Sequence, residues 1–306
     1  MKDLSKKSRQ PFLHGLPQVD LPKSRQDNME HVRSWLDFQP HLPELTDEHL
    51  HLYLHACYDN LEKTKQMIES CYTFRTLTPE LFSNRDVYGH DFQGVIETCE
   101  VMLLPRATPE GHQVAMFRFT DYDASKLVYV DGLKALFIAI DVYLSMHGLS
   151  SGCICVIDVK GVNLGHVAKI HPLSLLKKSL FFIQECMPVR LKGVHVVNTG
   201  TIIEKVMTLC KPFLKEDLAR LLHFHAAVDN LGEHLPLDIL PEEYGGKAGS
   251  SASIYNELKN MLFTHYVDWL GEEEGLRTDE SKRVGQSAVK DTLFGAEGSF
   301  RKLQID

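Results

Sequence analysis

Three short apolar runs, separated by segments of helical length, constrain the fold of this chain most. Residues 114–117, 153–157 and 194–197 are almost continuously apolar, as is typical of strands buried on both faces. Between them, residues 131–146 and 173–187 have helical periodicity. Strands that alternate with helices predict an α/β core, with a mixed, mostly parallel sheet covered by helices.

Helical start signals precede this core. Thr46 stands before two acidic residues, Asn60 before an apolar stripe, and Pro79 follows Thr78, which predicts a small helical bundle. The core closes at 245–246, where two glycines precede an amphipathic helix at 254–270. We therefore predict an irregular arm at 1–28, the bundle at 29–85, the α/β domain at 86–248, and a C-terminal helix with an acidic tail at 249–306.

Composition excludes several classes of protein. With 33 Lys and Arg against 41 Asp and Glu, the 306 residues carry a formal charge of -8, so nucleic acid is not an expected partner. The seven cysteines include no C-x-x-C pair, which is typical of a reduced, cytosolic protein. The first residues lack an apolar signal region, and the longest apolar stretch is too short to span a bilayer. We expect a cytoplasmic protein.

Motifs for catalysis or metal binding are weak. No Gly-rich nucleotide loop follows a strand, and no G-x-S-x-G occurs. His223 and His225 would share one face of a strand, but a metal site needs further ligands. The alternative is that one ring bonds a backbone carbonyl while the other packs near the surface. Asp158 at a strand end has no partner acid. The sequence predicts no enzyme, no cofactor and no metal site.

Two features of the sequence point to a function beyond a folded core: one apolar helix and one basic stretch. Within residues 202–214, apolar side chains recur at helical spacing. Pro212 interrupts this apolar stripe. A broken apolar helix of this kind is a candidate lid. Residues 177–220 carry eight Lys and Arg against four Asp and Glu. Basic surface beside an apolar helix is suited to an anionic membrane.

Four longer motifs then identify a family resemblance. The runs at 157–164, 187–198, 211–214 and 240–246 read IDVKGVNL, MPVRLKGVHVVN, KPFL and LPEEYGG. In this order and spacing, after a helical segment, the chain over about residues 30–248 resembles the CRAL-TRIO lipid-binding family. It looks most like the branch of the alpha-tocopherol transfer protein, the cellular retinaldehyde-binding protein and the clavesins.

The resemblance implies an intracellular lipid transfer protein that holds one hydrophobic molecule, such as a tocopherol, a retinoid or a similar isoprenoid, in a closed pocket. The helix after Asn198 would be a mobile gate, with the gate residues Ile202, Ile203, Phe213 and Leu214. The expected ligand-binding residues are Leu133, Phe137, Ile140, Cys153, Cys155, Ile157, Leu164, Ile183, Met187, Val194, Val206, Met207 and Cys210.

The resemblance also implies contact with an anionic membrane, through transient peripheral association and with phosphoinositides as headgroups. Arg190 and Lys192 match two basic positions of the family's cleft. Four other expected basic positions are occupied by His55, Cys57, Asp217 and Leu221. Lys215 and Arg220 are the expected substitutes.

Two other functions stay open at this point. A phosphoinositide-binding scaffold or signalling module would keep the pocket lipid as a structural element. An enzyme acting on a lipid would need a titratable pair facing the pocket, and the expected lining is nearly free of carboxylates and histidines.

Overall fold

The computed structural model describes residues 21–300, and of residues 295–300 the backbone alone. Most of the predicted irregular arm lies outside the described residues, but its last part is helical, because α1 spans Lys23–Leu36. The helices α2 (Asp47–Ala56), α3 (Leu61–Leu77) and α4 (Pro79–Phe82) complete the N-terminal layer.

The residues predicted to begin the helices of this layer lie at their N-terminal ends. The Thr46 hydroxyl accepts from the His49 backbone N–H, and the His49 ring caps Thr46 in return. The Asn60 side chain accepts from Lys63, and Pro79 occupies the first turn of α4. These caps satisfy backbone donors that no carbonyl inside the helix can reach.

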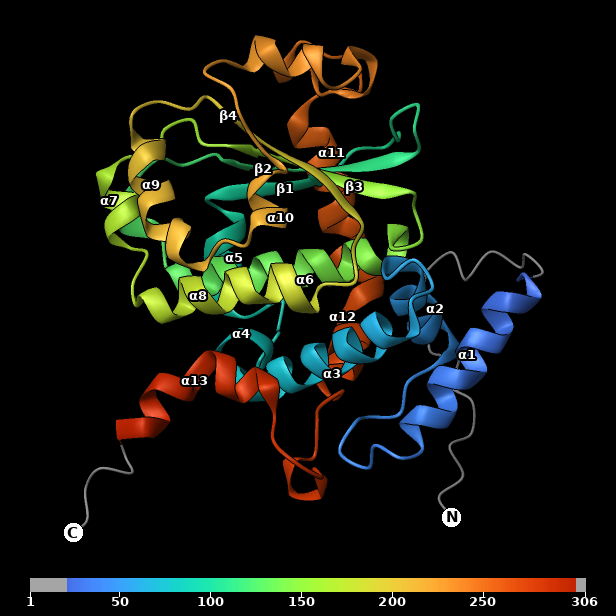
Figure 1. Cartoon of the computed structure of the whole chain (residues 1–306). Helices are drawn as coiled ribbons and strands as arrows, with labels where there is room; N and C mark the ends of the chain where they lie inside the picture. The colour runs from blue at the N-terminus through green and yellow to red at the C-terminus, as the bar shows by residue number, and fades with distance from the viewer. Residues whose placement is uncertain (1–20, 301–306) are drawn as a thin grey trace.

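A five-stranded sheet forms the centre of the molecule (Figure 1). Its strands are β1 (Cys99–Leu103), β2 (His112–Phe119), β3 (Gly152–Asp158), β4 (Leu191–Val197) and β5 (Leu222–Phe224), in that spatial order. Strands β1 and β2 are antiparallel, and all other neighbours are parallel. The predicted mixed, mostly parallel sheet is confirmed, and β1 is an addition that the apolar runs did not indicate.

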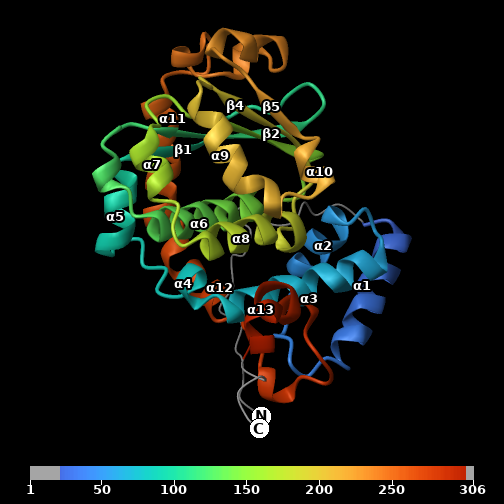
Figure 2. The same cartoon turned by 60° about the vertical axis from the view of Figure 1, so that its left-hand side comes forward.

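Helices cover one face of this sheet and loops cover the other (Figures 1 and 2). The helical side contains α5 (His90–Ile96), α6 (Tyr129–His147), α7 (Leu164–Ala168), α8 (Leu173–Phe181) with a π-helical turn η2 (Phe182–Cys186), α9 (Ile202–Cys210), η3 (Lys211–Phe213) and α10 (Glu216–Ala219). The opposite face packs against three short turns, η4 (Val228–Glu233), η5 (Leu237–Ile239) and η6 (Glu242–Tyr244). A short turn, η1 (Ala124–Lys126), precedes α6.

The C-terminal region is more ordered than the predicted tail. The expected amphipathic helix runs as α11 (Ser251–Met261), a π-helical turn η7 (Leu262–Tyr266) and α12 (Val267–Glu274). After η8 (Glu280–Lys282), α13 (Ala288–Phe300) follows. Val289 and Leu293 of α13 join the core around α3, so the described part of the tail is a packed element, because its apolar residues recur at helical spacing.

Candidate ligand-binding site

Helix α9 presents an apolar face that the fold buries only in part. Ile203, on α9, and Leu214, just beyond η3, pack with Val194 and Val196 of β4. None of the nine residues of α9, all of which the structure describes, is buried. Val206 and Met207 keep part of their surface accessible. An ordinary core helix would bury this stripe, so α9 covers the sheet without packing tightly on it.

Two half-buried thiols lie on β3 and α9, which face each other. A hydrogen bond with Cys153 and then burial raise the pKa of the Cys155 thiol on β3, and burial also raises the pKa of Cys210 on α9. Both side chains are therefore largely removed from water and keep part of their surface accessible.

Part of the predicted lining comes together between α9, α6 and the sheet. Ile157, Ile183, Val194 and Cys155 belong to one apolar cluster with Ile203 of α9. Ile140 of α6 and Cys153 of β3 meet Cys155 in the adjoining cluster. Val206, Met207 and Cys210 are half-buried on α9 itself.

Four predicted lining residues are elsewhere. Phe137 is completely buried and lies against Phe82 and Phe182, with ring centroids 5.1 and 4.7 Å apart. Leu133 and Met187 belong to the same core between α6 and the N-terminal layer. They pack there because that side of α6 faces the bundle. Leu164 is 60% exposed at the first turn of α7.

The sequence prediction missed other residues of this region. Val196, Leu180 and Leu222 contribute to the cluster below α9. Val196 follows from the two-residue period of β4, since it shares a face with Val194. Burial raises the pKa of Tyr129 to about 12, against the effect of a hydrogen bond with Ser179, and the Cys210 thiol raises it further. This hydroxyl at the start of α6 is thus a polar group next to the gate helix.

Hydrogen bonds hold both ends of α9 to η3, the predicted gate. At its C-terminal end, Gln184 Nε2 donates to the Phe213 carbonyl (3.0 Å), and Gln184 Oε1 accepts from the Lys215 backbone N–H (2.7 Å). At its N-terminal end, Thr199 donates through both its backbone N–H (3.0 Å) and its hydroxyl (2.9 Å) to the His225 carbonyl. Pro212 lies in η3, where the helix is broken as the sequence predicted.

Arg190 and Lys192 come together around one aromatic ring. The Arg190 guanidinium lies 3.9 Å from the Tyr58 ring centroid, and Lys192 Nζ donates to the Tyr58 hydroxyl (3.0 Å). Tyr58 is 61% exposed and has a positive φ of 54°. The predicted substitutes are in other contacts, since Lys215 pairs with Glu185 and Arg220 with Glu216.

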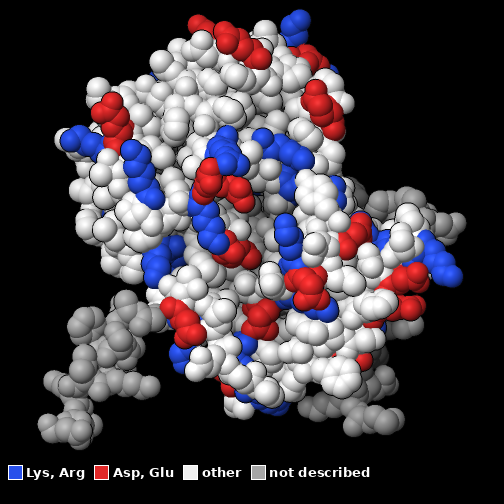
Figure 3. Space-filling view, in the orientation of Figure 1, with Lys and Arg blue, Asp and Glu red and all other residues white. Residues whose placement is uncertain are grey.

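Arg190, Lys192 and the nearby Arg25 form a basic cluster beside Tyr58. Arg25 was not predicted from the sequence. It pairs with Asp59 (Nη2–Oδ2, 2.5 Å) and lowers the pKa of Arg190, after burial. Burial and then Arg25 lower the pKa of His51 to about 4, and burial lowers that of His55. Figure 3 shows Lys and Arg side chains interspersed with acidic ones across the middle of the face that carries α8 to α10.

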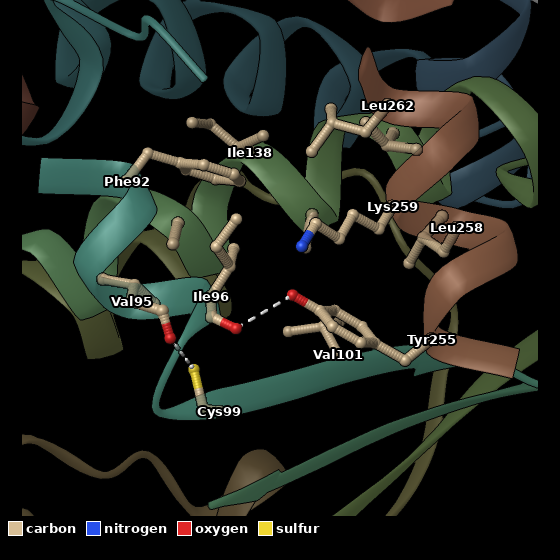
Figure 4. Close-up of a pocket in the computed structure, with 13 residues that line it drawn as sticks. Phe92, Val95, Ile96, Cys99, Val101, Ile138, Tyr255, Leu258, Lys259 and Leu262 are labelled. Carbon is tan, nitrogen blue, oxygen red and sulfur yellow. Dashed lines mark hydrogen bonds between the residues drawn. The ribbon is translucent and has the colours of Figure 1, made fainter. Parts of the chain in front are cut away.

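A separate apolar cavity lies on another side of α6, between α5, β1 and α11 (Figure 4). It is partly open to solvent, and its accessible volume is about 50 Å³. Ala135, Ile138 and Val142 of α6 line it, and Lys259 lies at its edge with Tyr255, whose hydroxyl donates to the Ile96 carbonyl (3.3 Å). None of the predicted lining residues contributes to it.

The candidate catalytic and metal residues have structural partners. The Asp158 carboxylate accepts from Asn198 Nδ2 (2.7 Å), the Tyr244 hydroxyl (2.9 Å) and the Lys160 backbone N–H (2.9 Å). His225 contacts the His195 ring (2.9 Å between Nε2 and Nδ1) rather than a backbone carbonyl. Within residues 21–300, no three His, Cys, Asp or Glu side chains are placed to hold a metal ion.

In the described part of the chain, no helix combines the length and the apolar composition needed to cross a bilayer.

Comparison with known families confirms the predicted resemblance. Residues 98–246 match the model of the CRAL/TRIO domain, and residues 21–92 match the model described as Pinta-like, UBA domain. The first match contains the sheet and α9, and the second contains α1 to α4 and the beginning of α5.

Individual relatives are distant. A human protein named alpha-tocopherol transfer protein-like is 28% identical over 207 residues, which are 67% of this chain and 60% of that protein. Clavesin-1 of Xenopus laevis is 24% identical over 229 residues, 74% of this chain and 69% of its own. The chain thus spans about three fifths of the length of the tocopherol-type relatives that it matches.

A solved structure supports the fold. The crystal structure of Sfh5 superposes with a TM-score of 0.54 and 16% identity, covering 84% of this chain and 98% of that one. At this identity the likeness concerns the architecture alone.

Proposed function

Because this chain carries a CRAL/TRIO domain over residues 98–246, we propose that it is a lipid transfer protein, which holds one hydrophobic molecule between α9 and the sheet and exchanges it at membranes. The observation that carries the proposal is the incompletely buried apolar face of α9 above half-buried Cys155 and Ile157. A ligand in this space would remove that surface from water, which contributes about 2.5 kcal/mol for each 100 Å² of apolar area.

The lining indicates the class of ligand. Its aliphatic and thiol side chains adapt to an extended apolar body, and Tyr129 beside Ser179 and Cys210 offers a hydroxyl for one polar end. A tocopherol, a retinoid or a similar isoprenoid has this distribution of polarity. No chemical turnover is part of the proposal, and Asp158, the carboxylate at the end of β3, is saturated by donors.

Membrane contact is assigned to the basic cluster of Arg25, Arg190 and Lys192 around Tyr58. Arg25 is paired with Asp59, so Arg190 and Lys192 carry the net charge of the cleft in which the sequence has His55 and Cys57 in place of the family's basic residues. A cytoplasmic carrier with this cluster would associate transiently with anionic membranes, where each near-surface cation contributes about 1 kcal/mol. Phosphoinositides are the headgroups that we propose.

The test is transfer of a fluorescent tocopherol between donor and acceptor vesicles. With phosphoinositide in the acceptor membrane, the double variant Arg190→Glu and Lys192→Glu should slow transfer at least tenfold, because two attractive charges become repulsive. Binding of the probe in detergent-free solution should stay within about twofold. The matched control, Lys290→Glu on α13, exposes its side chain elsewhere and should transfer at the rate of the unmodified protein.

Two outcomes would contradict the proposal. Transfer by the unmodified protein that is no faster than spontaneous leakage of the probe would favour a scaffold with a structural lipid. Equal slowing by the Lys290 variant would show that overall charge, and not this cluster, governs the encounter.

A further inference from the structure

Four histidine rings gather on the sheet face opposite α9. His195 lies on β4 and shares its face with Val197, which belongs to the core beneath η4 to η6. His223 and His225 come from β5 and its end, and His234 follows η4. Three separate elements therefore meet through imidazoles at the edge of the sheet.

The rings are in mutual contact. The His195 centroid is 4.9 Å from that of His223, 5.2 Å from that of His225 and 5.2 Å from that of His234. His225 and His234 are 4.9 Å apart. His195 and His225 are also in hydrogen-bond contact through Nδ1 and Nε2, at 2.9 Å. This contact needs one ring nitrogen to accept, so it is lost when both rings are protonated.

Positive charge on the two buried rings, His195 and His225, is unfavourable in the folded state. Burial first, and then His223, His225 and His234, lower the pKa of His195 from 6.5 to about 4. Burial first, and then His234 and His223, also lower the pKa of His225. The carboxylate that acts in the opposite direction on His225 is Glu233, at the end of η4, and its effect is smaller than that of burial.

The same segment fixes the N-terminal end of the gate. The His225 backbone N–H donates to the Val196 carbonyl (2.8 Å). The His225 carbonyl in turn accepts both hydrogen bonds of Thr199, two residues before the Thr201 cap of α9. Separation of β5 from β4 at His225 would therefore release the N-terminal hinge of the gate helix.

We propose that this four-histidine cluster is an acid-sensitive anchor of the gate: protonation forces the rings apart, frees Thr199 and opens α9. The device rests on the proposed function in one respect, namely that opening of α9 releases the ligand. It would couple release to acidic compartments or to the lowered pH at an anionic membrane surface, where a potential of about -30 mV corresponds to about half a pH unit.

The direction and size of the effect follow from the pKa values. The folded pKa of His195 lies below its unfolded value, so its neutral form supports the closed state at neutral pH and this support is lost as the pH falls below 6.5. If the opened state restores an ordinary pKa, linkage gives an increase of roughly 20-fold in the open population between pH 7 and pH 5.

The test is hydrogen–deuterium exchange of the full ligand-free chain in the presence of a chelator, corrected for the intrinsic pH dependence of exchange. For the unmodified protein, opening of residues 199–210 should rise about 20-fold from pH 7 to pH 5, while α3 and β3 stay protected. His195→Asn keeps a donor near Nδ1 and removes the titrating group, so its opening should change less than about threefold. His265→Gln, on an exposed position of η7, should behave as the unmodified protein.

A second variant, at an exposed position, keeps the test valid if His195→Asn fails to fold. His234 is exposed in a loop, and His234→Gln should reduce the rise at least twofold. The proposal is overturned if the gate opens no further at pH 5, if both variants retain the full rise, or if α3 and β3 lose protection together with α9. Because the readout needs no ligand, a failure of lipid transfer leaves its result unaffected.

Discussion

At the scale of single residues, a buried carboxylate on α6 makes a large contribution to the stability of the fold. Asp141 of α6 accepts from Arg75 Nη2 (2.6 Å) and Arg85 Nη1 (2.7 Å), and all three side chains are buried. Burial alone would raise the pKa of Asp141, but Arg75 and Arg85 hold it below its usual value. This triad ties the N-terminal layer to the central helix of the α/β domain.

Asp141→Asn should therefore destabilise the protein by about 3–5 kcal/mol at pH 7, because it leaves two buried cations without a counterion. The folded pKa is depressed, so the contribution of Asp141 is complete above about pH 4 and is lost as the pH falls through the folded pKa. Urea unfolding at pH 7 measures the loss. Asp268→Asn, at an exposed position of α12, is the control and should cost less than about 0.5 kcal/mol. A loss below about 1 kcal/mol for Asp141→Asn would contradict this role.

The predicted lining residues do not all pack in one place. Cys155, Ile157 and Val194 follow from strand periodicity and meet in one cluster, whereas Phe137 packs towards the N-terminal layer, because α6 has apolar residues on several sides and touches three separate cores. Arg25 was missed because it lies far from Arg190 in the sequence, and only the packing of α1 brings the two together.

At the scale of elements, the gate is defined by its two ends. Gln184 belongs to the π-helical turn η2, a type of irregularity that is frequent at functional positions. Its side-chain amide makes hydrogen bonds with the backbone on both sides of Leu214, with the Phe213 carbonyl and the Lys215 N–H. A single side chain of α8–η2 therefore fixes the segment that follows Pro212.

Gln184→Ala should speed ligand release, because it removes two hydrogen bonds worth together about 2 kcal/mol, or some 30-fold in the opening equilibrium. Dissociation of the fluorescent tocopherol, followed by stopped-flow dilution, measures the effect. Gln93→Ala, which removes a comparable bond to the Val87 carbonyl (2.7 Å), serves as the control and should leave release unchanged. An unchanged rate for Gln184→Ala would mean that this contact is not part of the barrier.

Elements were predicted best where one signal acted locally. The break at Pro212, the caps at Thr46 and Asn60, and three of the five strands follow from neighbouring residues. Strand β1 owes its order to its pairing with the next strand, β2, and helix α13 to its packing against α3, which lies far away in the sequence. Neither partner could be inferred from the residues of the element itself.

At the scale of the whole molecule, the distribution of charge is more informative than the net charge of -8. The basic cluster is assembled from α1, from β4 and from Arg190 just before β4, around Tyr58 of the α2–α3 loop, so two regions that are distant in the sequence supply it. An overall acidic chain thus brings cationic side chains together at one place on its surface.

The central claim is that one hydrophobic molecule occupies the space between α9 and the sheet. It is tested with a matched pair of adjacent substitutions on α9, Val206→Trp on the half-buried apolar side and Lys205→Trp on the exposed side. A tryptophan at 206 should fill the space, whereas one at 205 should point into solvent.

The measurement is native mass spectrometry of the protein purified from its own source, with extraction of the bound molecule. We expect one lipid per chain for the unmodified protein and for Lys205→Trp, and an empty Val206→Trp protein whose free energy of unfolding changes by less than about 1 kcal/mol. An empty unmodified protein, together with a loss of about 1–3 kcal/mol for Val206→Trp, would show a fully packed core instead and would contradict the account.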